Sequence, residues 1–541
     1  MRSYFSFFVK KVSYALWLLF PFLTFAQEIL WERSYGGIDT EYLFDAYPTM
    51  DNGFLLAGSS LSDASGDRTE SNVQGLDYWI CKMDESGSME WERSFGGDGM
   101  DLLISMDYTA EGGFILAGTS TSSKSNFKKE STRGREDVWI IKLDPNGEEQ
   151  WQRTLGGSGK DIVKKILQTP DGGYILGGSS SSPGFEKETH TVEKNAPHYG
   201  NLDYWLVKLD SNGIIEWERT YGGIYKDQLE ALALTPDKGF IIGGYSNSPI
   251  SPTKSDSPMG SGGDYWVLKL DETGEIEWQK TLGGDADDHL YQILATQDKG
   301  YVLGGSSSSQ YEGSKTQSNS NGIDFWVVKL DEHGSIKWQE TYDFGEVDTL
   351  TSLVEDVEGN LFIGGSIQNR NYFQKVSSKE EGINDYVLIK VTEDGEELWK
   401  TFVGSGGQDV LRKIILTRDG DYVLAGTSRG EKSRDKNSQQ GRSDFWLVKL
   451  GDKDKKKEPD LPGLESYPNP TEGFTTVIVN HDFEEGTLTL YDLLGRRLQH
   501  FEISSRMQPV DLAAYPQGMY LITIATDVKS ESIKIIKGTQ H

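Results

Sequence analysis

Cysteine is almost absent from this chain of 541 residues, in which Cys81 is the single thiol. One cysteine cannot form an internal disulfide, so a fold that works in an oxidising compartment must be held together by packing. Cys81 lies in an apolar run typical of a strand. We therefore expect its side chain to be buried and unreactive.

Positive charge is also scarce, because 54 lysine and arginine residues stand against 84 acidic ones and the formal net charge is −30. Such a chain repels DNA, RNA and anionic lipid, which excludes nucleic acid as a partner. The histidines lack metal-ligand spacing, and no Gly-x-Ser-x-Gly or Gly-x-x-x-x-Gly-Lys motif occurs. The sequence therefore nominates no catalytic residue, metal motif or cofactor motif.

Long apolar runs are missing after the first thirty residues, so the mature chain is expected to have no transmembrane segment. At the N-terminus, Arg2, Lys10 and Lys11 precede the apolar run ALWLLFPFLTF, which is too short for a comfortable membrane span. Ala26 fits a small-residue cleavage site. Residues 1–26 are thus predicted to be a secretory signal peptide.

What the chain has in abundance is a repeat of about 60 residues. A tryptophan in contexts similar to EWERTYGG occurs seven times, as Trp31, Trp91, Trp151, Trp217, Trp278, Trp338 and Trp399. Each unit reads as four short strands in an antiparallel meander, with Asp-Gly or Lys-Gly turns between strands. Two of these strands are apolar on both faces, which indicates that other sheets cover them.

Stacked four-stranded units predict an all-β fold, a seven-bladed β-propeller over residues 27–451. A parallel β-helix is the main alternative, but its coils are much shorter than this repeat. Residues 28–37 supply a fourth strand with no third strand before it, and residues 444–451 supply a third strand with no fourth after it. We expect these two segments to pair and close the ring.

Tryptophans and charges that recur in every copy are interpreted as framework, because a ligand site is normally a single place. A set of lysines in the third strands is expected to form ion pairs at the blade margins. It comprises Lys82, Lys142, Lys208, Lys269, Lys329, Lys390 and Lys449.

An acidic residue also recurs ten residues after each repeat tryptophan. The set is Glu41, Asp101, Asp161, Asp227, Asp288, Asp348 and Asp409. These side chains enter the strand nearest the axis, where seven carboxylates could converge and bind a cation such as calcium. The alternative is that each carboxylate caps the turn that precedes its strand.

One loop departs from the repeat in a chemically suggestive way. In DADDHL at 285–290, Asp285, Asp287 and His289, together with Asp288, could chelate a hard cation, although a solvated acidic turn is the alternative. With Lys226, the residues Asp285, Asp287 and His289 form our candidate ligand-binding set. The sixth repeat is irregular as well, because YDF replaces its glycine pair.

Residues 452–464 are charged and contain proline, as expected of a linker, and short strands at sandwich spacing follow in 465–541. The motifs YPNP, LYDLLGRRL, LAAYPQGMYLITI and SIKIIK resemble the C-terminal sorting domain of the type IX secretion system of Bacteroidota. The matching positions are Tyr467, Pro468, Asn469, Pro470, Gly495, Gly518 and Tyr520. The resemblance implies contact with that secretion machinery, export across the outer membrane, and then release or attachment at the cell surface.

The repeats in turn resemble quinoprotein-like propellers and propeller repeats of secreted Bacteroidota proteins. Quinone-dependent dehydrogenases of that type typically have a vicinal disulfide, which one cysteine cannot form. The loops between the second and third strands are long and differ from copy to copy, so function is expected on that face. The sequence favours a secreted binding or scaffold module for glycan or protein. The alternative is a polysaccharide-active hydrolase or lyase that uses acidic residues on the same face.

Overall fold

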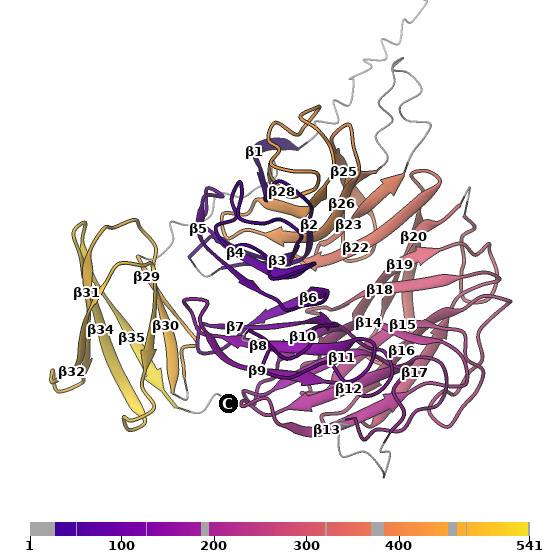
Figure 1. Cartoon of the computed structure of the whole chain (residues 1–541), viewed down its shortest axis with the longest axis horizontal. Coiled ribbons are helices and arrows are strands. Elements are labelled where there is room, and N and C mark those ends of the chain that lie inside the picture. The colour runs from indigo at the N-terminus through magenta and orange to yellow at the C-terminus, as the bar shows by residue number, and fades with distance from the viewer. Residues whose placement is uncertain are drawn as a thin grey trace, which may run out of the picture.

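The computed structural model describes residues 27–538, apart from residues 50, 126, 185–193, 320–321, 369–383, 453–462 and 472. These residues form 35 strands and no helix, as the all-β prediction requires (Figure 1). The described ranges accordingly contain no helix long and apolar enough to cross a membrane. The predicted signal peptide and most of the predicted linker lie outside the described residues.

Six consecutive groups of four strands each form one antiparallel sheet in sequence order. The first three sheets contain β2 (Glu41–Pro48), β3 (Phe54–Ser60), β4 (Asp77–Met83) and β5 (Met89–Phe95); β6 (Asp101–Tyr108), β7 (Phe114–Ser120), β8 (Asp137–Leu143) and β9 (Glu149–Leu155); β10 (Asp161–Gln168), β11 (Tyr174–Ser180), β12 (Asp203–Leu209) and β13 (Ile215–Tyr221). The next three contain β14 (Asp227–Leu234), β15 (Phe240–Ser246), β16 (Asp264–Leu270) and β17 (Ile276–Leu282); β18 (Asp288–Ala295), β19 (Tyr301–Ser307), β20 (Asp324–Leu330) and β21 (Ile336–Tyr342); β22 (Val347–Glu355), β23 (Leu361–Gln368), β24 (Asp385–Val391) and β25 (Glu397–Val403).

The seventh sheet is built from both ends of the repeat region. Its strands are β26 (Asp409–Leu416), β27 (Tyr422–Ser428), β28 (Asp444–Gly451) and β1 (Glu28–Tyr35), in which β1 pairs antiparallel with β28. Glu32 accepts a hydrogen bond from the Trp446 indole at 2.9 Å across this pair. The first strand of the chain therefore completes the last sheet, as the sequence predicts.

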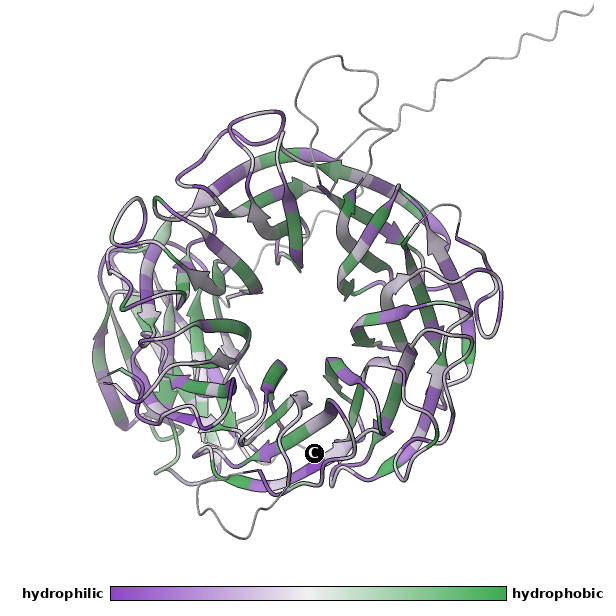
Figure 2. Cartoon of the chain, turned by 45° about the vertical axis from the view of Figure 1, so that its right-hand side comes forward, coloured by the Kyte–Doolittle hydropathy of each residue, from purple (hydrophilic) through white to green (hydrophobic). Residues whose placement is uncertain are grey.

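The seven sheets lie around a common axis, each as one blade of a propeller (Figure 2). The first strands of neighbouring blades contact one another all round the ring, and β2 contacts β26. Isolated parallel bridges join the start of a third strand to the start of the next blade's first strand, for example Leu202 to Lys226. The loops before these strands therefore emerge on one face of the ring, which we call the loop-rich face.

Burial explains the strand pattern of each blade. Second and third strands are buried along their whole length, whereas first strands alternate buried and half-buried side chains. The third-strand tryptophans, such as Trp79, are fully buried between blades. The fourth-strand tryptophans pack on the next blade: a Cβ on Gly213, which has a φ of 76°, would meet the Trp151 ring at 2.8 Å. The tryptophans are thus framework, as predicted.

The recurrent third-strand lysines form ion pairs at the face opposite the loop-rich one. Lys269 Nζ lies 2.7 Å from Asp237 and 2.8 Å from Glu277, and Lys208 makes the equivalent pairs with Asp171 and Glu216. These lysines pin the turn between the first two strands to the third strand, which agrees with the predicted structural role.

The remaining strands form a small two-sheet sandwich (Figure 1). One sheet contains β29 (Leu464–Tyr467), β30 (Phe474–Val479) and β33 (Met507–Asp511); the other contains β31 (Gly486–Asp492), β32 (Arg497–Ile503), β34 (Gly518–Thr526) and β35 (Ser530–Lys537). The sandwich contacts turns on the propeller face opposite the loop-rich one. Arg506 lies 3.5 Å from Glu85, and Arg418 pairs with Glu465.

Removing residues 27–36, and with them β1, should destabilise the whole propeller, because it strips the partner from β28 and the buried Tyr35 from the core between the seventh and first blades. We expect a loss of at least about 3 kcal/mol in the free energy of unfolding, the usual cost of deleting a large buried side chain. Thermal and chemical denaturation of chains beginning at residue 27 and at residue 37 measure it. Superimposable melting curves would contradict closure by β1.

Candidate functional site

Seven pairs of buried acidic side chains mark the junctions between blades on the loop-rich face. Each pair joins the first residue of a third strand to the acid of the next blade's first strand. The pairs are Asp77 with Asp101, Asp137 with Asp161, Asp203 with Asp227, Asp264 with Asp288, Asp324 with Asp348, Asp385 with Asp409, and Asp444 with Glu41. Every one of these side chains is buried.

The recurrent first-strand acids cap turns. At Asp161, the Ser182 hydroxyl donates at 2.6 Å and the Gly157 amide at 2.7 Å, and Ser180 donates to the second carboxylate oxygen. Asp227 has the same pattern with Ser248 and the Gly223 amide. Because all seven acids are fully buried, they do not line an axial opening. These contacts favour turn capping over a seven-carboxylate cation site on the axis.

Buried cations from the long loops accompany these acids, and sequence reasoning missed them. They are Arg68, Lys128, Lys194, Lys254, Lys315 and Lys436. Lys436 Nζ lies 3.3 Å from Asp444, and Lys194 donates to the backbone oxygen of Ser182 at 2.9 Å. Burial lowers the pKa of Lys128, Lys254 and Lys315 to about 8. The available signal was a basic residue eight to ten positions before each third-strand aspartate.

The candidate ligand-binding residues meet where the fourth and fifth blades adjoin. The His289 ring stacks on Tyr245 with centroids 4.3 Å apart and planes inclined by 12°, and it lies parallel to Tyr291 at 6.1 Å. Lys226 Nζ lies 5.3 Å from the Tyr245 ring centre. The Tyr245 hydroxyl donates to Asp287 at 2.9 Å. The structure thus brings together Lys226, Asp287 and His289 with two tyrosines that sequence reasoning did not select.

The electrostatics of this cluster favour an aromatic surface over a metal site. Burial lowers the pKa of His289, so its ring is neutral at pH 7. Burial and the bond to Asp287 raise the pKa of Tyr245 to about 12. Asp287 accepts a second bond from the Gly263 amide at 3.0 Å, and Asp285 accepts one from the Gln310 amide at 2.8 Å. Asp285 therefore holds a loop, and these contacts favour an acidic turn over a chelating cluster.

A second charged group lies further along the axial side of the first strands. Lys165 Nζ from β10 lies 3.1 Å from Asp45 Oδ2 in β2, and Lys413 Nζ from β26 lies 3.4 Å from Asp45 Oδ1. Lys165 also donates to the Tyr47 hydroxyl at 3.1 Å. Although burial opposes the change, the two lysines lower the pKa of Asp45. This group occurs once in the ring and ties three blades together.

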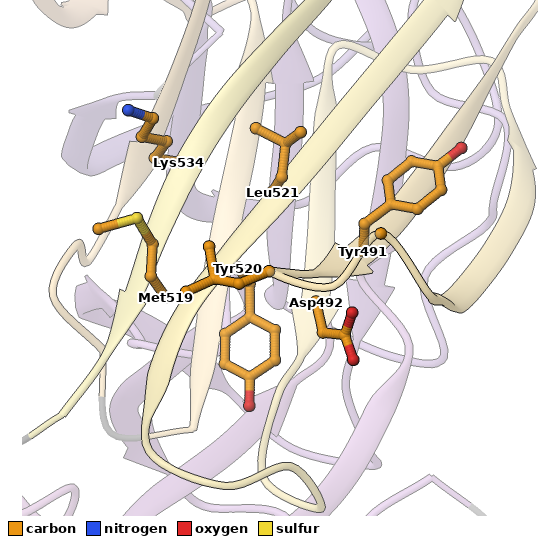
Figure 3. Close-up of a pocket in the computed structure, with 8 residues that line it drawn as sticks. Tyr491, Asp492, Met519, Tyr520, Leu521 and Lys534 are labelled. Atoms are coloured by element: carbon orange, nitrogen blue, oxygen red, sulfur yellow. The ribbon is translucent and has the colours of Figure 1, made fainter.

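The predicted sorting residues occupy the C-terminal sandwich. Asn469 donates to Lys534 O at 2.8 Å and accepts from the Ile536 amide at 2.9 Å, which fixes the YPNP segment to the edge of β35. Gly495 and Tyr520 line an open pocket of about 410 Å³, which is bordered by the exposed Leu493 (Figure 3). Gly518 opens β34 beside this pocket. The sorting positions therefore share one small domain, apart from the loop-rich face.

Comparison with known proteins separates the two parts of the chain. Residues 465–538 match the secretion system C-terminal sorting domain family, in agreement with the motif resemblance. The chain is 24% identical over 385 residues to the regulatory protein FlaEY of Caulobacter vibrioides, an alignment that covers 66% of this chain and 40% of that protein. This chain thus matches well under half of the relative's length.

Two solved structures are also similar. One is a fungal alcohol oxidase of the AA5 family in complex with copper, with 11% identity, coverage of 94% of this chain and 100% of that chain, and a TM-score of 0.41. The other is YCF48 bound to D1 peptide, with 10% identity, coverage of 79% and 97%, and a TM-score of 0.39. The description of this chain as a propeller rests on its own sheet order and not on these likenesses.

The buried acid pairs predict that the propeller loses stability as pH rises. Burial and the neighbouring carboxylate raise the pKa of Asp77, Asp264 and Asp348 to about 7 in the folded chain, against an ordinary value near 4. A raised carboxyl pKa contributes stability that is complete below the unfolded pKa and is lost as pH rises through the folded one. We therefore expect the free energy of unfolding to fall between about pH 4 and pH 7.

Chemical denaturation of residues 27–541 at a series of pH values measures this slope. Replacing Asp77→Asn keeps the shape of the side chain and removes one ionisable member of a pair, so the slope should become shallower. A free energy of unfolding that rises from about pH 4 to pH 7, or an unchanged slope in the variant, would contradict the assignment.

Proposed function

Because residues 465–538 belong to the secretion system C-terminal sorting domain family, we propose that the chain is exported and acts outside the cell as a glycan-binding propeller. The N-terminal residues 1–26 serve as its signal peptide, and Bacteroidota are its source group. The ligand lies on the loop-rich face beside Lys226, Asp287, His289 and Tyr291. Tyr245 supports the stack from behind, because it is buried.

One observation carries this proposal: His289 stacks on Tyr245 and lies parallel to Tyr291 at the junction of the fourth and fifth blades. The position of His289 in the first strand differs in every blade: it is Tyr42, Leu102, Ile162, Gln228, Thr349 and Val410 in the other six. Repeated positions serve packing, so a position that differs from blade to blade is free to serve recognition. His289 and Tyr291 are half-buried, and Asp287 is exposed beside them.

The residue types suit a sugar. Flat rings such as His289 and Tyr291 pack on the apolar face of a pyranose, while Asp287 and Lys226 offer an acceptor and a donor for its hydroxyl groups. The stack already holds the rings of His289 and Tyr291 in place, so these side chains lose little conformational entropy when a ligand binds. A segment of a charged or neutral polysaccharide that lies along the loop-rich face can make both the ring contacts and the hydrogen bonds.

Carbohydrate cleavage would require a pair of carboxyl groups exposed to the substrate at a defined separation. The carboxyl groups with raised pKa at the blade junctions are buried and engaged in turn capping. Asp285 and Asp287 accept hydrogen bonds from backbone amides. These features favour binding without turnover over the hydrolase or lyase alternative.

A glycan array probed with residues 27–541 tests the proposal, followed by titration calorimetry on the strongest ligand. His289→Ala and Tyr291→Ala should each weaken binding by about five- to tenfold, the effect of removing one stacked ring. His333→Ala is the matched control, because His333 is exposed on a turn between β20 and β21 at the opposite face and should bind as the unmodified chain does. Equal losses in all three variants, or no glycan ligand, would refute the site.

The same samples distinguish the enzymatic alternative. Incubation of the polysaccharide ligand with the chain should produce no new reducing ends and no unsaturated products. Release of either product, abolished by Asp287→Asn, would replace the binding proposal with a catalytic one.

A further inference from the structure

The junction between the fifth and sixth blades departs from the other six in its charge. It contains Asp324 at the start of β20, Asp348 in β22, and a third acid, Asp343, in the turn between β21 and β22. The carboxylate oxygens of these three residues lie within 4.8 Å of one another. Asp324 and Asp348 are buried, whereas Asp343 is exposed and connects the pair to solvent.

The third acid stands where the other six junctions have glycine. These glycines are Gly36, Gly96, Gly156, Gly222, Gly283 and Gly404. Each lies against the junction acids, since a Cβ on Gly222 would meet Asp203 Oδ1 at 2.2 Å and one on Gly283 would meet Asp264 Oδ1 at 2.2 Å. Asp343 therefore places a third carboxylate beside two buried ones. In the other six junctions this position is glycine, because a larger residue would contact the junction acids.

A serine that donates to the first-strand acid in other blades is also missing at Asp348. Ser180 and Ser246 donate to Asp161 and Asp227, and the equivalent residue in the sixth blade is Ile367. Asp348 Oδ2 accepts from the Phe344 amide at 2.7 Å. Asp348 Oδ1 is buried and has no hydrogen-bond partner within the described part of the chain. A fully buried carboxylate oxygen without a donor costs free energy unless a positive charge meets it.

From this geometry we propose that Asp324, Asp343 and Asp348 bind one calcium ion at the junction of the fifth and sixth blades. Two oxygens bound to one calcium ion at 2.3–2.6 Å can lie up to about 5 Å apart, so oxygens within 4.8 Å of one another have a spacing compatible with one ion. Three carboxylates offset the double charge of the ion, and water completes a coordination shell on the exposed side of Asp343. An affinity of about 10⁻⁴ to 10⁻³ M is expected, as in other extracellular calcium modules.

The electrostatics agree with this assignment. Burial, and then the charges of Asp324 and Asp343, raise the pKa of Asp348 to about 7. A metal-free junction therefore holds a proton at neutral pH or suffers repulsion among its acids.

Thermal denaturation of residues 27–541 with calcium chloride or with EDTA tests the proposal at about pH 8. The unmodified chain should melt several degrees higher in millimolar calcium, because only the folded junction binds the ion. Titration calorimetry with calcium alone should show one site.

Asp343→Gly restores the residue of the other six junctions and is therefore expected to fold. It should lose the calcium-dependent shift and should melt higher than the unmodified chain in EDTA, since one of three like charges has gone. Asp98→Asn is the matched control. Asp98 is an exposed acid in the equivalent turn, between β5 and β6, and this variant should keep the full calcium-dependent rise in melting temperature.

Two results would overturn the assignment. One is a calcium shift of equal size in Asp343→Gly, which would place the ion elsewhere. The other is the absence of both a shift and a calorimetric isotherm in the unmodified chain, which would show that these acids bind no calcium ion. Neither measurement depends on a glycan, so the calcium site and the proposed ligand stand or fall separately.

Discussion

The buried acid at the entrance to each blade is the interaction on which the propeller depends. Its carboxylate holds the amide of the turn that brings the chain from the outer strand of one blade to the inner strand of the next. The same carboxylate faces the third-strand acid of the preceding blade, so two groups that repel one another in water are kept together by packing. Serine hydroxyls and buried lysines from the long loops make this arrangement tolerable. The long loops differ in sequence from blade to blade, but their ends therefore make structural contacts with the junction acids.

Much of this fold could be predicted from the sequence because the repeat removes ambiguity. Trp151 and Trp217 look like binding residues alone, but their recurrence identifies them as packing residues, and the turn glycines they cover confirm that role. The completion of the seventh sheet by β1 followed from a missing strand at each end of the array. The match of residues 465–538 to a sorting domain followed from motifs in fixed order.

The sites were harder to predict because they depend on contacts between blades. Lys128 and Lys194 were missed because they lie in loops whose sequences differ from blade to blade. Tyr245 and His289 lie 44 residues apart, and nothing in the sequence reports that their rings stack. Conversely, Asp285 was selected for its acidic neighbours, although its carboxylate holds the Gln310 amide. Position within a blade could be predicted, whereas proximity across a junction could not.

The contacts of Glu85 and Arg418 with the sandwich have a consequence for orientation. Both residues lie in turns at the face of the ring opposite the long loops, so the sorting domain and the aromatic stack occupy opposite ends of the molecule. If the sandwich holds the chain at a cell surface, the propeller presents its stack to the surrounding medium and its lysine-pinned turns to the membrane. In the proposed glycan-binding role, a long polymer would then reach the stack without passing between the protein and the cell surface.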